Sequence, residues 1–168
     1  MKINVLIIAP NTIVRQGLLM LLDADEGIRA HAADPKPESM LHEAKRFRPD
    51  IAIFPVYAYD REVLTAVRKF QKAFPDVKIL LLLSELDEFL VMDSLQAGVD
   101  GILLDENNTD EKRLVENLRY LYEDGYVLTG KIAKLMMNNF NAMYASEKQQ
   151  LRRRLLTHGI HVSGGSWI

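Results

Sequence analysis

Acidic side chains follow the apolar runs of this sequence at points where a divalent cation could be held. Asp60, Asp105 and Glu106 each come shortly after such a run. Carboxylate oxygens are the ligands that hard cations such as Mg²⁺ prefer. Acid-rich loops are more often simply solvated, and no spacing in the sequence fixes the geometry of these three residues. The sequence therefore predicts no metal site, with a cation held by these carboxylates as the alternative.

Several other chemistries are excluded by residue types and spacing. The 168 residues include no cysteine, which excludes disulfides, a thiol nucleophile and thiolate metal sites. His158 and His161 are three residues apart, but two ligands on a glycine-rich segment do not make a metal site. His31 and His42 fit ordinary positions on a strand and a helix. Since neither a nucleophile–base pair nor a phosphate-binding glycine loop is visible, we expect no enzyme and no cofactor.

Basic side chains gather near the end of the chain. Residues 126–168 hold six Lys and Arg against one Asp or Glu, whereas residues 1–125 hold 15 against 22. A basic cluster of this kind neutralises DNA phosphates or forms the solvated face of a helix, and the sequence leaves both open. The candidate contacts to the DNA backbone are Lys148, Arg152, Arg153 and Arg154.

Five short apolar runs predict the strands that would position these side chains. They are Ile3–Ala9, Ile28–Ala33, Ile51–Val56, Lys78–Leu83 and Gly101–Leu104. The first, third and fourth are continuously apolar, as in strands that are covered on both faces. The second run is more polar, which indicates an edge strand.

Amphipathic segments between these runs predict five helices. The first follows Asn11 and Thr12, the second begins near Pro37, the third spans Arg61–Phe74, the fourth lies between Ser84 and Gly98, and the fifth lies between Thr109 and Gly125. This alternation predicts an α/β fold. We expect a flavodoxin-like, doubly wound five-stranded parallel sheet of order 2-1-3-4-5, with helices on both faces and its site at the carboxyl ends of the strands.

Four motifs resemble the receiver domain of two-component response regulators of the NarL/FixJ (LuxR-type) family. They are VRQGL from Val14, RPDI from Arg48, AGVDG from Ala97 and DGYVL from Asp124. The last two are specific in combination, because both stand at the spacing of that family. The resemblance covers residues 1–125 and implies a role in signal transduction and transcriptional regulation.

The resemblance and the end of the strand alternation divide the chain into three parts. We predict a receiver-like domain (1–125), a linker helix (126–145) and a basic helical tail (146–168) that resembles an incomplete helix-turn-helix domain. The tail is too short to supply a recognition helix, so DNA binding by this chain is expected to be weak. Neither a membrane-spanning run nor a signal-peptide pattern is present, so we expect a cytoplasmic protein.

The resemblance also implies a phosphorylation site, which this sequence does not keep. In the family, two acidic residues hold Mg²⁺, an aspartate accepts the phosphoryl group, and a lysine and a hydroxyl contact that group. The matching positions here are Ala9, Pro10, Pro55, Asp105 and Ser84, in that order. Neither alanine nor proline ligates a metal, Pro55 is no nucleophile, and Asp105 reverses the charge of the lysine. We therefore predict a pseudo-receiver that cannot accept phosphate by the family mechanism.

Ser84 is the one matching residue of the expected type, and it has a plainer interpretation. The segment Ser84-Glu85-Leu86-Asp87 is a capping-box pattern, which predicts that Ser84 caps the fourth helix. A relic of the family switch is the alternative.

The sequence thus predicts an atypical, phosphorylation-independent response regulator that acts through a homodimer and contacts with a regulatory protein. The alternative is a ligand sensor that binds an apolar small molecule in the emptied crevice at Ala9, Pro10, Pro55 and Ser84. The predicted dimer surface comprises the fourth and fifth helices, with the first and fifth helices as a second option. The apolar interface candidates are Met92, Leu118, Tyr120 and Tyr122.

Overall fold

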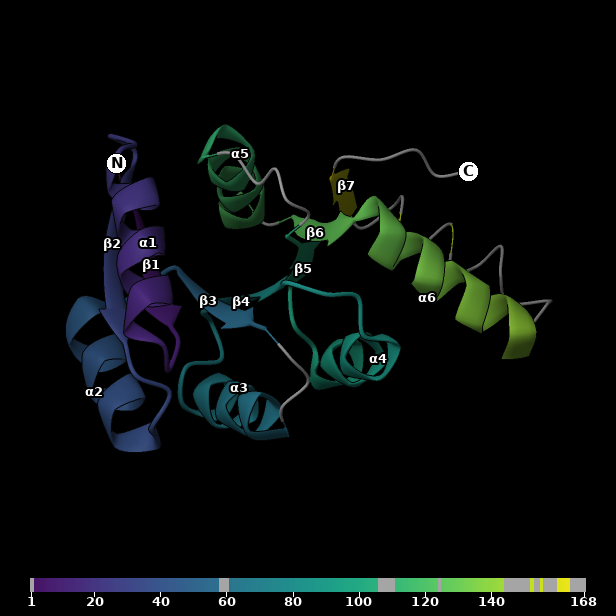
Figure 1. Ribbon diagram of the computed structural model, residues 1–168, viewed down its shortest axis with the longest axis horizontal. Coiled ribbons are helices and arrows are strands. Elements are labelled where there is room, and N and C mark those ends of the chain that lie inside the picture. Colours follow the sequence, from purple (N-terminus) through teal and green to yellow (C-terminus); the bar gives the residue numbers. More distant parts are fainter. Residues whose placement is uncertain are drawn as a thin grey trace.

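A parallel sheet forms the centre of the molecule (Figure 1). The computed structural model describes residues 2–57, 61–105, 111–123, 125–143, 152, 155 and 160–163. The strands are β1 (Ile3–Ile8), β2 (Ile28–Ala33), β3 (Ile51–Val56), β4 (Lys78–Leu83), β5 (Gly101–Leu104), β6 (Tyr126–Thr129) and β7 (Ile160–Ser163). They form one seven-stranded sheet of order β2-β1-β3-β4-β5-β6-β7.

The first five strands confirm the predicted fold, and the last two correct it. Their order is 2-1-3-4-5, and the polar strand β2 lies at the edge as predicted. A five-stranded sheet is nevertheless wrong, because β6 pairs in parallel with β5 and β7 pairs with β6. Both strands fall in segments predicted to be helical. Each is only four residues long, too short for an apolar run to be distinguished from part of a helix.

Helices cover both faces of the sheet, as predicted. On one face, α1 (Thr12–Asp23) and α5 (Glu111–Tyr122) bury a core cluster that includes Leu22 and Leu118. On the other, α2 (Pro37–Phe47), α3 (Arg61–Ala73), α4 (Glu88–Ala97) and α6 (Gly130–Met143) bury a second cluster around Phe54 and Phe70. In Figure 1, α5 lies above the sheet, and α3 and α4 lie below it.

The segment after residue 125 packs into this same core. Ile132 and Ala133 of α6 are fully buried, and α6 contacts α4, β5 and β6. The predicted boundary at residue 125 stays a prediction, but these contacts tie β6 and α6 to the sheet. None of the helices in the described part of the chain is long and apolar enough to cross a membrane.

The family-like motifs supply helix ends. Arg48 ends α2 in the left-handed region at φ 55°, and its N–H bonds to the carbonyl of Ala44. Gly98 ends α4 at φ 82°, a conformation that glycine adopts without the steric cost of a side chain. At the start of α1, the side chain of Asn11 accepts hydrogen bonds from two N–H groups of the first turn, which confirms the predicted start of this helix.

Two aspartates from the same motifs join neighbouring strands where those strands begin, an end of the sheet called here the amino edge. One carboxylate oxygen of Asp50 accepts from the N–H of Asn4 at 2.8 Å, and the N–H of Asp50 donates back to the carbonyl of Asn4 at 2.8 Å. Asp100 makes the same pair of bonds with Ile79, at 2.8 and 2.9 Å. These bonds satisfy backbone groups that lie at the start of a strand and set its pairing register.

Candidate functional site

The five positions that match the family phosphorylation site lie at the carboxyl edge, where the parallel strands end. Ala9 and Pro10 follow β1, Pro55 is the next-to-last residue of β3, Ser84 follows β4, and Asp105 follows β5. The strand bounds therefore place all five residues at one edge of the sheet. Within the described ranges, no group of three or more His, Asp or Glu side chains is arranged to hold a metal.

An arginine covers the end of β1. The guanidinium of Arg15 donates to the carbonyl of Ala9, and it also donates to the hydroxyl of Thr12 at 3.1 Å. The same guanidinium lies 3.7 Å from a carboxylate oxygen of Asp34. The guanidinium therefore occupies the carbonyl at the end of β1, and its charge is paired with that of Asp34.

The side chain of Ser84 is hydrogen-bonded to the end of the neighbouring strand β3, and the predicted capping role is wrong. Its hydroxyl donates to the carbonyl of Tyr57 at 2.8 Å, just beyond β3. The N-cap of α4 is Asp87, whose carboxylate accepts from the N–H of Leu90 at 3.0 Å. Because the hydroxyl of Ser84 is used by a residue 27 positions away, the local capping pattern gave the wrong start for this helix.

The carboxyl end of β5 is closed by hydrogen bonds to its neighbours. The N–H of Asp105 donates to the carbonyl of Leu83 at 2.6 Å. The N–H of Leu104 donates to the hydroxyl of Thr129 at 2.8 Å. Sequence reasoning missed Thr129 because it belongs to β6, and the only signal for that strand is the short YVLT segment after Gly125.

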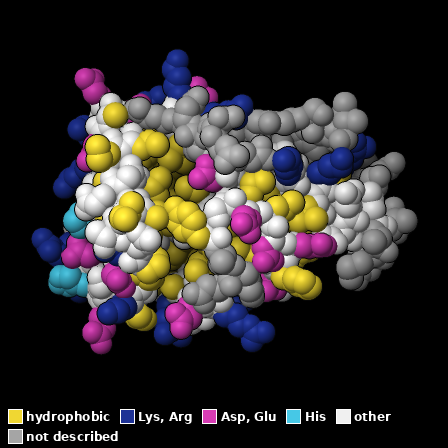
Figure 2. Space-filling model, viewed as in Figure 1, with side chains coloured by type: hydrophobic (Ala, Val, Ile, Leu, Met, Phe, Trp, Pro, Cys, Tyr) yellow, Lys and Arg dark blue, Asp and Glu magenta, His cyan; other side chains and the backbone are white. Residues whose placement is uncertain are grey.

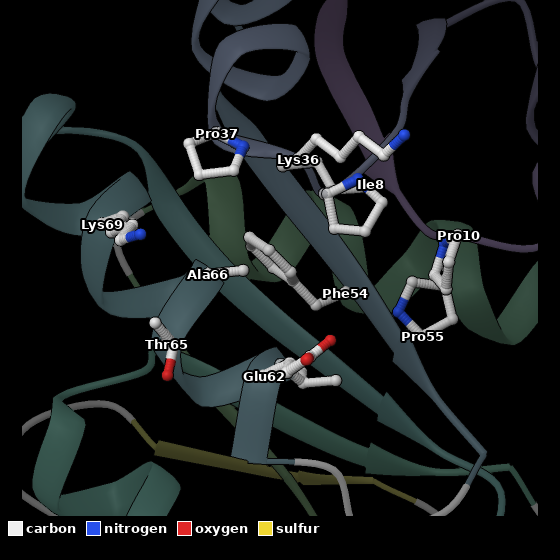
Figure 3. Close-up of a pocket in the computed structure, with 12 residues that line it drawn as sticks. Ile8, Pro10, Lys36, Pro37, Phe54, Pro55, Glu62, Thr65, Ala66 and Lys69 are labelled. Atoms are coloured by element: carbon white, nitrogen blue, oxygen red, sulfur yellow. The ribbon is translucent and has the colours of Figure 1, made fainter.

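A pocket of about 390 Å³ opens beside the predicted crevice, towards α2 and α3 (Figure 3). Pro10 and Pro55 line it, but Ala9 and Ser84 do not, so the pocket and the predicted crevice overlap only in part. Pairing between β1 and β3 ends at Ile7 and Ile53, which leaves the two strands apart beyond that point. The lining residues are Ile8, Pro10, Pro35, Lys36, Pro37, Phe54, Pro55, Glu62, Val63, Thr65, Ala66 and Lys69.

The predicted interface residues are less accessible than the sequence suggested. Leu118 is fully buried in the core and contributes no surface, so its assignment to an interface is wrong. Tyr120 and Tyr122 are half-buried and pack against the same core cluster, and Met92 is half-buried. β6 also pairs along the exposed side of β5, and α6 packs on α4. The predicted surface between α4 and α5 is therefore filled in part by this chain itself.

Other apolar side chains are the ones that reach solvent. Phe89 on α4 is 79% exposed, and Ile13 on α1 is 82% exposed. Figure 2 shows hydrophobic side chains gathered in the middle of one face, with charged side chains around them. An apolar helix position alone does not separate a core residue from a surface one.

Most of the basic tail falls outside the described residues. This applies to Lys148, Arg153 and Arg154, and also to the acidic candidates Asp60 and Glu106 and to His158. Arg152 is described and exposed. Residues 160–163 form β7, whereas the sequence predicted a helical tail over this segment. The role of the basic cluster stays a prediction.

Comparisons with known proteins place these features in context. No protein-family model matches the chain. The transcriptional regulatory protein LnrK of Bacillus subtilis is 25% identical over 138 residues, which cover 82% of this chain and 62% of LnrK. The oxygen regulatory protein NreC of Staphylococcus epidermidis is 26% identical over 138 residues, with 82% and 62% covered. This chain therefore spans less than two thirds of the length of these relatives.

Solved structures show the same fold. The isolated receiver domain of RcsB from Salmonella enterica, in its apo form, matches with a TM-score of 0.69 at 16% identity, covering 80% of this chain and 98% of that domain. A CheY-like receiver domain protein from Methanospirillum hungatei matches with a TM-score of 0.61 at 19% identity, covering 73% and 95%. The predicted resemblance to a receiver domain is confirmed.

Proposed function

We propose that this chain, which has the fold of a receiver domain and resembles NarL/LuxR-family response regulators, acts in signal transduction and transcriptional regulation without accepting a phosphoryl group. The observation that carries this proposal is the composition of the carboxyl edge. Pro55 stands where the family has its nucleophile. Ala9 stands where the family has a metal-binding acid, and its backbone carbonyl accepts a hydrogen bond from Arg15. The hydroxyl of Ser84 is bound to the carbonyl of Tyr57.

The groups that the family uses for phosphoryl transfer act together, so a site without most of them is not expected to keep part of that activity. Phosphoryl transfer depends on positioning and on neutralising charge around the transferred group. Here the nucleophile, the metal ligands and the cation are all replaced, and Asp105 adds a negative charge where the family has a positive one. No other nucleophile–base pair supports an enzymatic reaction in the described residues, so the proposed function is regulatory.

The direct test is incubation with acetyl phosphate and Mg²⁺, followed by intact-mass measurement. We expect no phosphate adduct, while a receiver domain that keeps all the acidic residues gains one under the same conditions. The variant Pro55→Asp should also stay unmodified, because Ala9 and Pro10 still provide no metal ligands. A stoichiometric adduct on the unaltered chain that hydroxylamine removes would contradict the proposal.

Without a phosphoryl switch, output has to come from contacts with other molecules. We include a homodimer in the proposal, through the exposed side of α4. Phe89 and Met92 are three residues apart on that helix and therefore lie on the same side. Sedimentation of the unaltered chain should show a dimer, and Phe89→Ala should weaken it. Glu88→Ala, an exposed neighbour, is the matched control, and a monomer at high micromolar concentration would contradict this part.

The contact with DNA that we propose is non-specific. The structure of RcsB from Salmonella enterica has been solved with a bound promoter, and that binding is a property of RcsB. For this chain we propose only a weak, sequence-independent attraction to DNA, since the basic residues are outnumbered by acids in residues 1–125. Gel-shift titrations should show similar affinity for promoter and scrambled duplexes, and that affinity should fall steeply with salt. A strong preference for one sequence would contradict it.

A further inference from the structure

The pocket between β1, β3, α2 and α3 has unusually rigid walls. Four of the six prolines of the chain line it. They are Pro10, Pro35, Pro37 and Pro55. Proline fixes φ and has no N–H, so these walls hold their shape and offer apolar ring surface without backbone donors. A volume of about 390 Å³ is within the range of small-molecule pockets.

The remaining wall is also largely apolar. Figure 3 shows the ring of Phe54 in the middle of the labelled residues, with Ala66 of α3 beside it. Ile8 and Val63 complete the apolar lining. Flat apolar rings pack well against aromatic and proline rings, and this packing is the physical basis of proline recognition by aromatic grooves. The pocket therefore suits a compact ring system better than a polar ligand.

The charge around the pocket is mainly positive. Lys36 and Lys69 line it from α2 and α3, with Glu62 as the one lining acid. Figure 3 shows these three side chains on different sides of the apolar centre. Within the part of the chain that the structure describes, neither ammonium group has a carboxylate partner. Lys36 is also the N-cap of α2 and contributes no side-chain cap, so the positive end of that helix lies at the rim.

We propose that this pocket binds a small aromatic carboxylic acid. The ring system lies between the prolines and Phe54, and the negative charge of the carboxylate is attracted by Lys36 on one side of the pocket and by Lys69 on another. Since the ligand contacts both α2 and α3, it holds these helices in one relative position. Binding would therefore bias the conformation of a receiver that has no phosphoryl switch. The proposal does not depend on the absence of phosphorylation, because the ligand test and the mass test have separate readouts.

The test uses three probes with the same ring system and different head groups. They are 2-naphthoate, 2-naphthalenemethanol and 2-naphthylmethylammonium, each titrated into the 168-residue chain by calorimetry and by amide-resolved NMR. We expect 2-naphthoate to bind most tightly and to shift amide resonances of the pocket residues. Equal affinity for the three probes, or no shift at the pocket with millimolar 2-naphthoate, overturns the proposal.

Variants separate the apolar and charged contributions. Ala66→Leu fills the pocket and should reduce 2-naphthoate affinity by at least about tenfold, since about 1.4 kcal/mol corresponds to that factor. Lys36→Ala and Lys69→Ala should each weaken binding by about two- to fivefold, as expected for an exposed ion pair. Lys72→Ala, an exposed lysine on α3 outside the pocket lining, is the matched control and should change nothing. The two exposed lysines can be replaced without disturbing the core, so unchanged affinity in both lysine variants overturns the proposed charge recognition even if Ala66→Leu fails to fold.

Discussion

The amino and carboxyl edges of the sheet differ in what their residues do. At the amino edge, Asp50 and Asp100 belong to motifs that resemble the receiver family, and both carboxylates bind backbone N–H groups of neighbouring strands. At the carboxyl edge, Ala9, Pro10 and Pro55 stand at the positions that, in our proposal, match the reactive groups of that family. Under the proposed function, the difference teaches that the residues that build this fold and the residues that react on it are separable. A sequence would then keep the first set and lose the second.

The largest expected effect concerns the segment of β6 and α6, and it tests whether this segment belongs to the same folded core as the two edges of the sheet. Ile132→Ala should lower the free energy of unfolding by about 2–5 kcal/mol, because Ile132 is fully buried in the core. Lys134→Ala, an exposed neighbour on α6, should have little effect. Denaturant unfolding measures both. A loss below about 0.5 kcal/mol, the range of ordinary surface substitutions, would mean that the chain after residue 125 is not part of the core.

The amino edge should be sensitive to loss of a carboxylate. Asp100→Ala should destabilise the fold by about 1.5–3 kcal/mol, because the N–H of Ile79 loses a charged acceptor. Asp100→Asn keeps an acceptor oxygen and should recover part of that loss. Chemical denaturation of the two variants gives the comparison. If alanine and asparagine were equally mild, the amino edge would not carry the structural role described above.

The carboxyl edge should be less sensitive. Ser84→Ala removes one hydrogen bond to the carbonyl of Tyr57, and the expected loss is about 0.5–1.5 kcal/mol. Asp87→Ala, which removes the N-cap of α4, should cost about 1 kcal/mol and reports on the same region through a different bond. Thermal unfolding of both variants is sufficient. A larger effect for Ser84→Ala than for Asp100→Ala would reverse the contrast between the two edges.

The smallest expected change in stability comes from a hydrogen-bonded pair that belongs to neither edge of the sheet. Nε2 of His31 on β2 lies 2.6 Å from a carboxylate oxygen of Glu43 on α2, and this hydrogen bond, with the nearby positive charges, lowers the pKa of Glu43. A lowered pKa in the folded state contributes stability that is present above the ordinary glutamate pKa of about 4.3 and is lost as the pH falls through the lowered value. Glu43→Gln should therefore be slightly less stable than the unaltered chain at pH 7, and the difference should shrink towards pH 3. An unchanged difference across this range, measured by denaturant unfolding, would contradict the assignment.

Sequence reasoning located the elements well where their signals are local. The apolar run at Lys78–Leu83 and the cap at Asn11 are complete within a few residues, and the structure confirms both. Sequence reasoning failed where the structure of a segment depends on a partner that is distant in the sequence. The hydroxyl of Ser84 is bound across the sheet, and the YVLT segment becomes a strand because the edge of β5 is available for pairing. The pocket was only partly predicted for the same reason, since α3 supplies much of its wall.

Pro55 has a consequence for how such a chain can change over generations. It lies buried in β3 at the wall of an apolar pocket. An aspartate at this position, without metal ligands at Ala9 and Pro10, would place a carboxylate in apolar surroundings with no bound cation, which costs free energy and restores no reaction. If the site is silent, as we propose, a gain of phosphorylation would require several substitutions at once, and this one would be a disadvantage by itself. Selection for stability would then act against the first step, and new regulation would evolve elsewhere on the fold.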